Sequence, residues 1–107
     1  MKHPQLNQIL PQVKQYFCSF YREQLESIIL YGSQAREDAK EDSDIDILVI
    51  LKSVVNPYQE INKTSVFIAD LCLKYDVVIS RHFISETQFK KDNTPFLFNI
   101  RKEGIIL

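Results

Sequence analysis

The chain has 107 residues, of which 45% are hydrophobic and 25% are charged, and its formal net charge at pH 7 is −1. This length and composition are typical of a single domain, residues 1–107, with an ordinary buried core. No apolar run approaches the roughly 20 residues of a membrane span, so we expect no membrane insertion. A nearly neutral chain has little electrostatic attraction for a phosphate backbone, so we do not expect it to bind a long nucleic acid.

Residues 4–23 are predicted to form a helix, because apolar side chains recur at three- and four-residue spacing. Pro11 lacks an amide hydrogen, so this helix either begins or bends there. Cys18 lies in it and Cys72 in a later helix, and without CxxC spacing we expect both to be buried free thiols in a reducing cytoplasm. The predicted core stripe consists of Leu6, Ile9, Leu10, Val13, Phe17 and Phe20.

The next apolar run, from Ser27 to Tyr31, ends at Gly32 and Ser33. We expect a buried strand here that leads into a helical turn. Gly32 has no Cβ, so the backbone can come close to a ligand at this point. The amides that open the turn, together with the Ser33 hydroxyl, are suited to holding a phosphate.

A second strand is predicted over Ile45–Leu51, with alternate residues on opposite faces of the sheet. Asp44 and Asp46 open it and point the same way, about 6–7 Å apart. Carboxylates held this close repel each other unless a cation lies between them. Mg²⁺ suits this position, because it accepts one or two protein carboxylates and leaves room for substrate phosphates. The pair predicts a site for phosphoryl or nucleotidyl transfer, and solvated loop acids are the alternative.

A third helix is expected to begin at Asn56-Pro57, with Asn56 as the N-cap, and to run to about Lys74. A third strand is predicted to follow over Tyr75–Ser80, opened by Asp76. If this strand neighbours the second one, Asp76 completes a three-carboxylate cluster with the earlier pair. A capping or salt-bridge role for Asp76 is the alternative. The inward stripe of the helix is expected to be Ile61, Ser65, Ile68, Leu71 and Cys72, widened by Val66 and Phe67.

The last third of the chain contains recognisable helix signals but no clear site. Ser85 and Gln88 form the pattern of a capping box. Thr94-Pro95 predicts a final helix that ends at Gly104, and residues 105–107 are suited to a short strand. His82 is interpreted as a surface or packing residue, although its position just after the third strand would allow it to approach a substrate.

The residues around the Gly32 turn resemble the signature of the DNA polymerase β-type nucleotidyltransferase superfamily. Gly32-Ser33 is followed, after ten residues, by Asp44-Ile45-Asp46. The wider pattern, Gly-Ser-x-Ala-Arg followed by Ser-Asp-Ile-Asp-Ile-Leu-Val, is similar to that of the smallest branch, the minimal nucleotidyltransferases. The resemblance covers residues 28–80 and, more loosely, the chain to residue 104. It implies an α+β, two-layer fold, a small mixed sheet with helices packed mainly on one face.

The resemblance also implies site residues and a reaction. Two Mg²⁺ ions would bind Asp44, Asp46 and Asp76, and ATP or another nucleoside triphosphate would place its outer phosphates on Gly32 and Ser33. An acceptor hydroxyl would attack the α-phosphorus, and pyrophosphate would leave. These three aspartates are therefore the expected catalytic residues.

For Arg36 the resemblance implies a role in holding the loop or in meeting nucleotide phosphates. Pairing of Arg36 with a nearby acid, which would be Glu37, Asp38 or Asp42, is the alternative. Many relatives have glycine where this chain has Glu37, so the contacts of the following loop, including those of Lys40, are open.

The acceptor is inferred from what the chain lacks. It is too short to contain a polymerase thumb or a basic groove, which argues against processive polymerisation. As the resemblance implies, small members of the branch pair with HEPN-domain toxins in hetero-oligomers and can transfer AMP to a toxin tyrosine. We therefore expect a cytoplasmic, antitoxin-like protein that adenylylates its partner. Nucleotidyl transfer to a small molecule and neutralisation of the partner by binding alone are the alternatives.

Overall fold

A mixed sheet forms the centre of the molecule, and the computed structural model describes residues 4–40 and 43–107. In this part of the chain four strands have the order β3-β2-β1-β4. β1 pairs antiparallel with both β2 and β4, and β2 pairs parallel with β3. The strands are β1 (Leu25–Tyr31), β2 (Ile45–Leu51), β3 (Ile79–Ser85) and β4 (Ile105–Ile106). The predicted second strand is confirmed at both ends.

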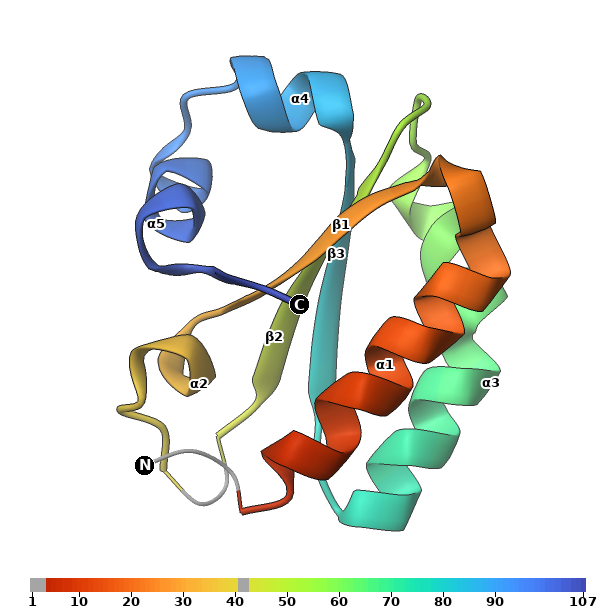
Figure 1. The fold of residues 1–107 in the computed structure, drawn as a ribbon, viewed down its shortest axis with the longest axis vertical. Coiled ribbons are helices and arrows are strands. Elements are labelled where there is room, and N and C mark those ends of the chain that lie inside the picture. Colours follow the sequence, from red (N-terminus) through yellow and green to blue (C-terminus); the bar gives the residue numbers. More distant parts are fainter. Residues whose placement is uncertain (1–3, 41–42) are drawn as a thin grey trace.

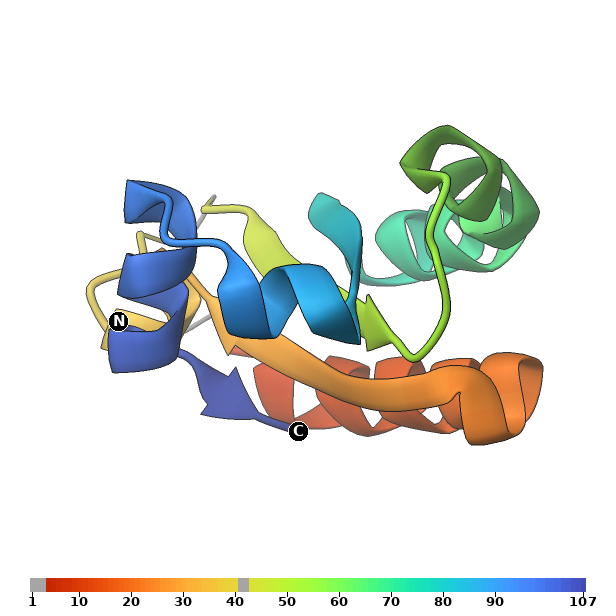
Figure 2. The same ribbon diagram turned by 90° about the horizontal axis from the view of Figure 1, so that it is seen from above.

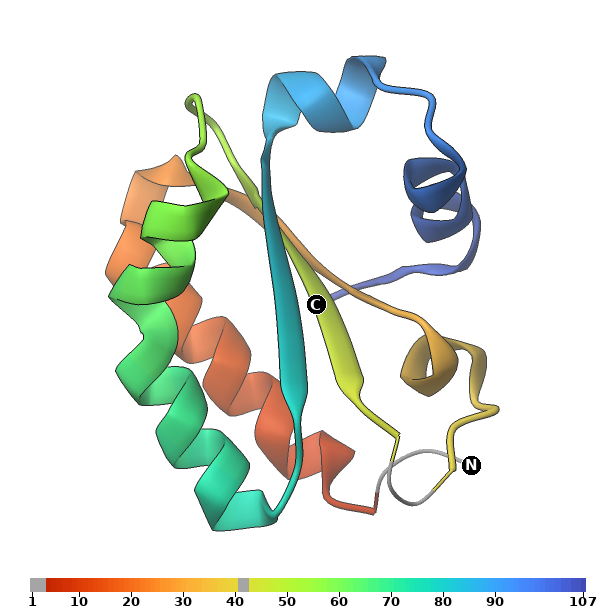
Figure 3. The same ribbon diagram turned by 180° about the vertical axis from the view of Figure 1, so that it is seen from behind.

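The long helices α1 (Leu6–Tyr21) and α3 (Pro57–Tyr75) cover one face of the sheet (Figure 1). The shorter helices α2 (Ser33–Arg36), α4 (Glu86–Lys91) and α5 (Pro95–Glu103) lie on the other side, as the view from behind also shows (Figure 3). Seen from above, the strands pass between α5 and α3 (Figure 2). The predicted α+β fold, with a small mixed sheet and its long helices on one face, is confirmed.

Two cores result from the alternation of β2 side chains. Ile47 and Val49 pack into a larger cluster with the buried side chains of α1 and α3. Leu48 and Ile50 face the opposite way and pack with Leu97 of α5. Because both faces of β2 are covered, its near-continuous apolar sequence is explained.

Helix α1 begins before Pro11 and includes it. The predicted stripe is buried at Leu6, Ile9, Val13 and Phe17, but Phe20 is 43% exposed. Both cysteines are free thiols, as predicted, yet Cys18 is exposed rather than buried. A short 3-10 helix, η1 (Arg22–Gln24), follows and turns the chain into β1. The C-terminal turn of α1 thus has one side exposed to solvent.

Helix α3 buries Ile68 and Leu71 as predicted, but in its first half the buried stripe is shifted by one residue from the predicted one. Its buried residues are Glu60, Thr64, Ile68 and Leu71, whereas Ile61 and Val66 are exposed. The helix has its predicted cap, since the Asn56 side chain accepts a hydrogen bond from the amide of Gln59. Hydrophobicity alone predicted that Ile61 rather than its neighbour Glu60 would be buried. That prediction is wrong, because Glu60 has polar partners in the interior.

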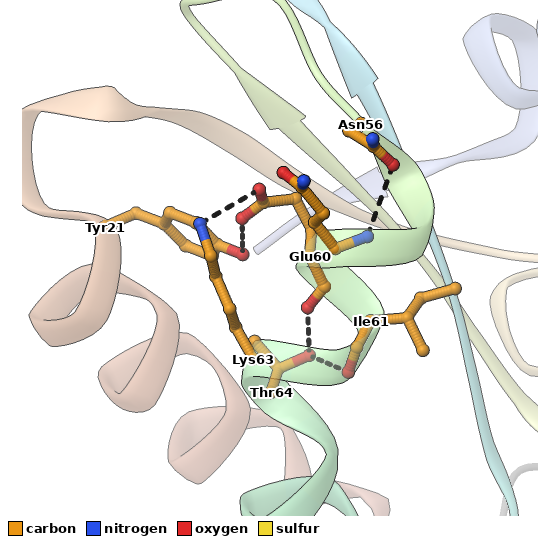
Figure 4. Close-up of polar contacts among 7 residues, drawn as sticks. Tyr21, Asn56, Glu60, Ile61, Lys63 and Thr64 are labelled. Carbon is orange, nitrogen blue, oxygen red and sulfur yellow. Dashed lines mark hydrogen bonds and ion pairs between the residues drawn. The ribbon is translucent and has the colours of Figure 1, made fainter.

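These partners form a small cluster between α1 and α3 (Figure 4). The Tyr21 hydroxyl donates a 2.8 Å hydrogen bond to Glu60 Oε1, and Lys63 Nζ lies 3.4 Å from Glu60 Oε2. The Thr64 hydroxyl donates to the backbone carbonyl of Glu60 at 2.9 Å. A buried carboxylate is tolerated when it is paired in this way. Burial and the neighbouring Glu60 carboxylate raise the pKa of Tyr21, so its hydroxyl stays protonated and remains a donor.

Tyr21→Phe is expected to lower the free energy of unfolding by about 1–3 kcal/mol, because it removes a hydrogen bond to a buried charge. The change is measured by urea denaturation of both proteins. Tyr58→Phe is the matched control, since Tyr58 is 75% exposed, and it should leave the unfolding curve unchanged. Equal curves for Tyr21→Phe and the wild type would contradict a stabilising role for this cluster.

Among the residues that the structure describes, none of the helices has both the length and the apolar character needed to cross a membrane.

Candidate functional site

The turn at the end of β1 is shaped by Gly32. Its φ of 75° and ψ of −156° lie in a region that is essentially restricted to glycine. The Gly32 carbonyl accepts hydrogen bonds from the amides of Ala35 and Arg36 at 3.1 and 3.2 Å, which starts α2. A Cβ built on Gly32 would lie 2.5 Å from Oδ2 of Asp46. The predicted strand–turn–helix is confirmed, and its backbone directly faces the Asp46 carboxylate.

Asp46 reaches this position because Tyr31 of β1 lies opposite it in the antiparallel ladder. It is partly buried, and Asp44, just before β2, is exposed. Burial and, after it, the charge of Asp44 raise the pKa of Asp46. The structure therefore brings the two acids together at the start of β2, where their charges are incompletely compensated. Two adjacent carboxylates supply the hard oxygen donors that Mg²⁺ prefers, so these residues fit a divalent cation.

Asp76 does not open the third strand, and the predicted boundary is wrong. Helix α3 continues to Tyr75, Asp76 is its C-cap with φ 52° and ψ 54°, and β3 begins only at Ile79. Aspartate tolerates this left-handed conformation because its short polar side chain can bond locally. Within residues 4–40 and 43–107, no group of three or more His, Cys, Asp or Glu side chains is placed to hold a metal ion. The expected three-carboxylate cluster is therefore not formed, and the β3 residue opposite Asp46 is Ser80.

Two substitutions at Asp76 separate a capping role from a metal-binding role. Asp76→Gly is expected to retain nucleotidyl transfer and to raise the free energy of unfolding by about 1 kcal/mol, since glycine adopts positive φ without a steric cost. Asp76→Ala is expected to be less stable than the glycine variant but equally active. Urea denaturation and transfer rates check both. If each variant loses transfer, the carboxylate is needed for catalysis and the capping role is insufficient.

Arg36, at the end of α2, has acidic partners in the structure. Its Nε lies 3.2 Å from Asp38 Oδ2, and its Nη1 lies 3.4 Å from Glu103 Oε2 of α5. The bond to Asp38 is the main reason that the pKa of Arg36 is raised. Asp42, another predicted partner, lies outside the described residues, as does Glu41. All groups of both pairs are well exposed to solvent, so a phosphate can compete for the guanidinium.

Gln34 is a site-supporting residue that the sequence did not reveal. It is fully buried in α2, and its Nε2 donates to the carbonyl of Ser43 at 3.3 Å. Ser43 Oγ in turn accepts a 2.8 Å hydrogen bond from the amide of Lys40. These bonds tie the turn after β1 to the chain that leads into Asp44. Glu37 has a φ of 65°, the left-handed conformation in which glycine commonly ends a helix.

Three rings gather on the same side of the sheet as Asp46. The Tyr31 hydroxyl and His82 Nδ1 are 2.8 Å apart, and the rings of Tyr31 and Phe96 meet edge to face at 5.4 Å. The His82 and Phe96 ring centroids are also 5.4 Å apart. Burial, followed by the Asp46 charge, raises the pKa of Tyr31 to about 12, so its hydroxyl stays protonated at neutral pH and shares a hydrogen bond with His82 Nδ1. Only the parallel register of β2 and β3, invisible in the sequence, brings His82 here.

The turn, the acid pair and the sheet order have counterparts in known proteins. A family model described as a nucleotidyltransferase domain matches residues 10–107. The chain belongs to this nucleotidyltransferase domain family. The resemblance drawn from the Gly-Ser and Asp-x-Asp residues is thereby confirmed, and the domain is of an enzyme class that transfers nucleotidyl groups.

Two curated relatives match the nucleotidyltransferase domain over most of their length, and both come from Methanocaldococcus jannaschii. One, named "Putative protein adenylyltransferase MJ0604", is 40% identical over 94 residues, covering 83% of this chain and 84% of the relative. The other, "Putative protein adenylyltransferase MJ0141", is 29% identical over 98 residues, covering 92% of this chain and 94% of the relative.

Solved structures share the fold at lower sequence identity. A toxin–antitoxin structure with AMP-PNP has a TM-score of 0.61 at 15% identity, covering 92% of this chain and 72% of that one. A mutant of the toxin–antitoxin MntA-HpeT has a TM-score of 0.60 at 16% identity, covering 91% and 69%. A nucleotidyltransferase structure from Sulfolobus solfataricus, also named "putative", has a TM-score of 0.59 at 24% identity, covering 88% and 70%. These likenesses establish the nucleotidyltransferase fold.

Proposed function

We propose that this nucleotidyltransferase domain transfers AMP from ATP to a hydroxyl group of a partner protein. The observation that carries the proposal is the approach of the Gly32 backbone to the Asp46 carboxylate. It puts a turn that can receive phosphates beside a pair of acids that can hold a divalent cation. The protein adenylyltransferase names of the two Methanocaldococcus jannaschii relatives support AMP as the transferred group and a protein as the acceptor.

In this proposal Asp44 and Asp46 hold Mg²⁺, and Gly32, Ser33 and Arg36 bind the triphosphate. When bound, the metal ion supplies positive charge that stabilises phosphate oxygens during transfer and lowers the pKa of a bound hydroxyl. Gly32 leaves space for phosphate oxygens next to the turn, and Ser33 supplies a hydroxyl donor. Arg36 exchanges its exposed carboxylate partners for phosphate, and its charge then offsets that of the leaving pyrophosphate.

The reaction forms one bond and breaks another at the α-phosphorus. The acceptor oxygen bonds to phosphorus, the bond to the bridging oxygen of pyrophosphate breaks, and the acceptor proton passes to solvent or to a nearby base. The protein's main contribution is to hold the acceptor oxygen and the leaving oxygen in line. A second Mg²⁺, as the family resemblance implies, requires ligands in addition to Asp44 and Asp46, and the Asp76 variants above test one of them.

The partner is proposed to be a HEPN-type toxin in a hetero-oligomer, with this domain as the antitoxin. The toxin–antitoxin structures that share its fold support this choice of partner. The free thiols Cys18 and Cys72 agree with a reducing cytoplasm as the location.

The test uses the full chain, Mg²⁺ and the protein encoded beside it, with ATP labelled either at the α- or at the γ-phosphate. Label from the α-position alone should appear on the partner, and it should be lost with Asp46→Asn but kept with Asp70→Asn, an exposed control on α3. Label from the γ-position would indicate phosphorylation instead. A tight complex without label, unchanged by Asp46→Asn, would refute transfer and favour neutralisation by binding.

A further inference from the structure

A pocket of about 240 Å³ opens beside the Gly32 turn, between the end of β1 and helix α5. Tyr31 and Phe96 supply ring walls, Arg36 lies at one side, and Asn99 offers its amide. This volume is below the range for drug-sized ligands, so it suits one ring system rather than a whole nucleotide. The pocket shares Gly32 with the proposed phosphate site, so a group bound here lies within one nucleotide length of Asp46.

The side chains of Phe96 and Asn99 are accessible to a ligand and are not buried in the core. Phe96 is 41% exposed although it packs edge to face on Tyr31. Asn99 is exposed, and among the residues that the structure describes its side-chain amide has no hydrogen-bond partner. Neither residue is needed to fill the smaller core, which is made by Leu97 and Ile100 of the same helix.

We propose that this pocket binds the adenine base of the nucleotide, with Asn99 reading its edge and Phe96 packing on its ring. An amide offers a donor and an acceptor side by side, which matches the N6 amino group and the ring nitrogen N7 of adenine. Guanine presents two adjacent acceptors on the corresponding edge, so one atom of the amide would be unmatched. Arg36 of α2 and Glu103 of α5, which form an exposed ion pair in this structure, both line the pocket.

The inference rests on one part of the proposed function, namely that the domain binds ATP. It does not depend on which group accepts AMP. An acceptor side chain is the other possible occupant. The position of the pocket favours the base, because it adjoins the phosphate-binding turn on the β1 side of Asp46. The β3 side, where Ser80 lies opposite Asp46, is the edge of the sheet and leaves a separate approach for an acceptor.

The experiment measures dissociation constants of MgATP, MgGTP and magnesium tripolyphosphate by calorimetry, with the full chain. Phe96→Ala and Asn99→Ala should each weaken MgATP binding about 5- to 100-fold and leave tripolyphosphate binding unchanged. Asn99→Ala should also reduce the preference for ATP over GTP, because it removes the amide that distinguishes the two bases. Phe98→Ala is the matched control, because Phe98 is on the same helix and 61% exposed but does not line the pocket, and it should bind all three ligands normally.

Equal binding of MgATP and tripolyphosphate by the wild type would overturn the inference, as would an unchanged ATP preference in all the variants. If Phe96→Ala raises only the KM for the partner protein, the pocket holds the acceptor and the inference is wrong. If base discrimination depends on Asn99 but no label reaches any protein, the base pocket stands and the proposed transfer fails.

Discussion

Asp46→Asn is expected to reduce nucleotidyl transfer by about 10²–10³-fold while making the metal-free fold more stable at neutral pH. Loss of a carboxylate from the proposed cation site removes several kcal/mol of charge stabilisation in the transition state. The same carboxylate destabilises the metal-free fold, because it is partly buried and lies next to Asp44. The charges of His82 and Arg36 offset this destabilisation only in part. Transfer rates and thermal unfolding, each with and without MgATP, check the two effects.

The pH dependence of this stability difference follows from the raised pKa of Asp46. A carboxyl whose pKa is higher in the folded than in the unfolded protein binds more protons when folded, so the wild type loses stability as pH rises through that range. The asparagine variant does not share this loss. The stability advantage of Asp46→Asn over the wild type should grow as pH rises from the ordinary aspartate pKa to the raised pKa of Asp46. It should stay constant at higher pH and vanish below the ordinary pKa.

A matched control and an opposing ligand effect sharpen the test. Asp70→Asn removes an exposed carboxylate from α3 and should change neither stability nor transfer. Saturating MgATP should raise the melting temperature of the wild type and of this control but not that of Asp46→Asn, because ligand that binds only the folded state stabilises it. If Asp46→Asn is less stable than the wild type at neutral pH, the interpretation that the charges of Asp44 and Asp46 are incompletely compensated is wrong.

The sequence was sufficient to predict the centre of the fold and of the site. Ile45–Leu51 is apolar on both faces, so its place in the middle of the sheet follows from burial. The Gly32 turn follows from the end of one apolar run, and the acid pair follows from the start of the next. Both predictions use local patterns, and the structure brings Gly32 and Asp46 together.

The failures concern residues whose environment depends on distant parts of the chain. Asp76 was assigned to a strand because valines and an isoleucine follow it, yet the preceding helix continues to Tyr75, where Gln12 of α1 donates a hydrogen bond to the Tyr75 hydroxyl. Glu60 was overlooked because its partner Tyr21 is 39 residues away. The ring cluster of Tyr31, His82 and Phe96 requires the strand order and the position of α5, neither of which a local pattern specifies.

Gly32→Ala is expected to destabilise the fold by about 1–3 kcal/mol and to abolish detectable transfer. The backbone at this position is nearly exclusive to glycine, which accounts for the loss of stability. The added Cβ would lie 2.5 Å from Oδ2 of Asp46, so the carboxylate must rotate away from its position against the Gly32 turn. Urea denaturation measures the first effect, and transfer rates at saturating ATP measure the second.

A double-mutant cycle with Asp46→Ala separates backbone strain from the steric clash. In the Asp46→Ala background the new Cβ meets no carboxylate, so Gly32→Ala should there cost only the strain of its dihedral angles. The difference between the two costs is the free energy of the clash. If Gly32→Ala costs the same in both backgrounds and the single variant still transfers AMP, the close approach of this turn to Asp46 is not what organises the site, and the proposed chemistry loses its structural basis.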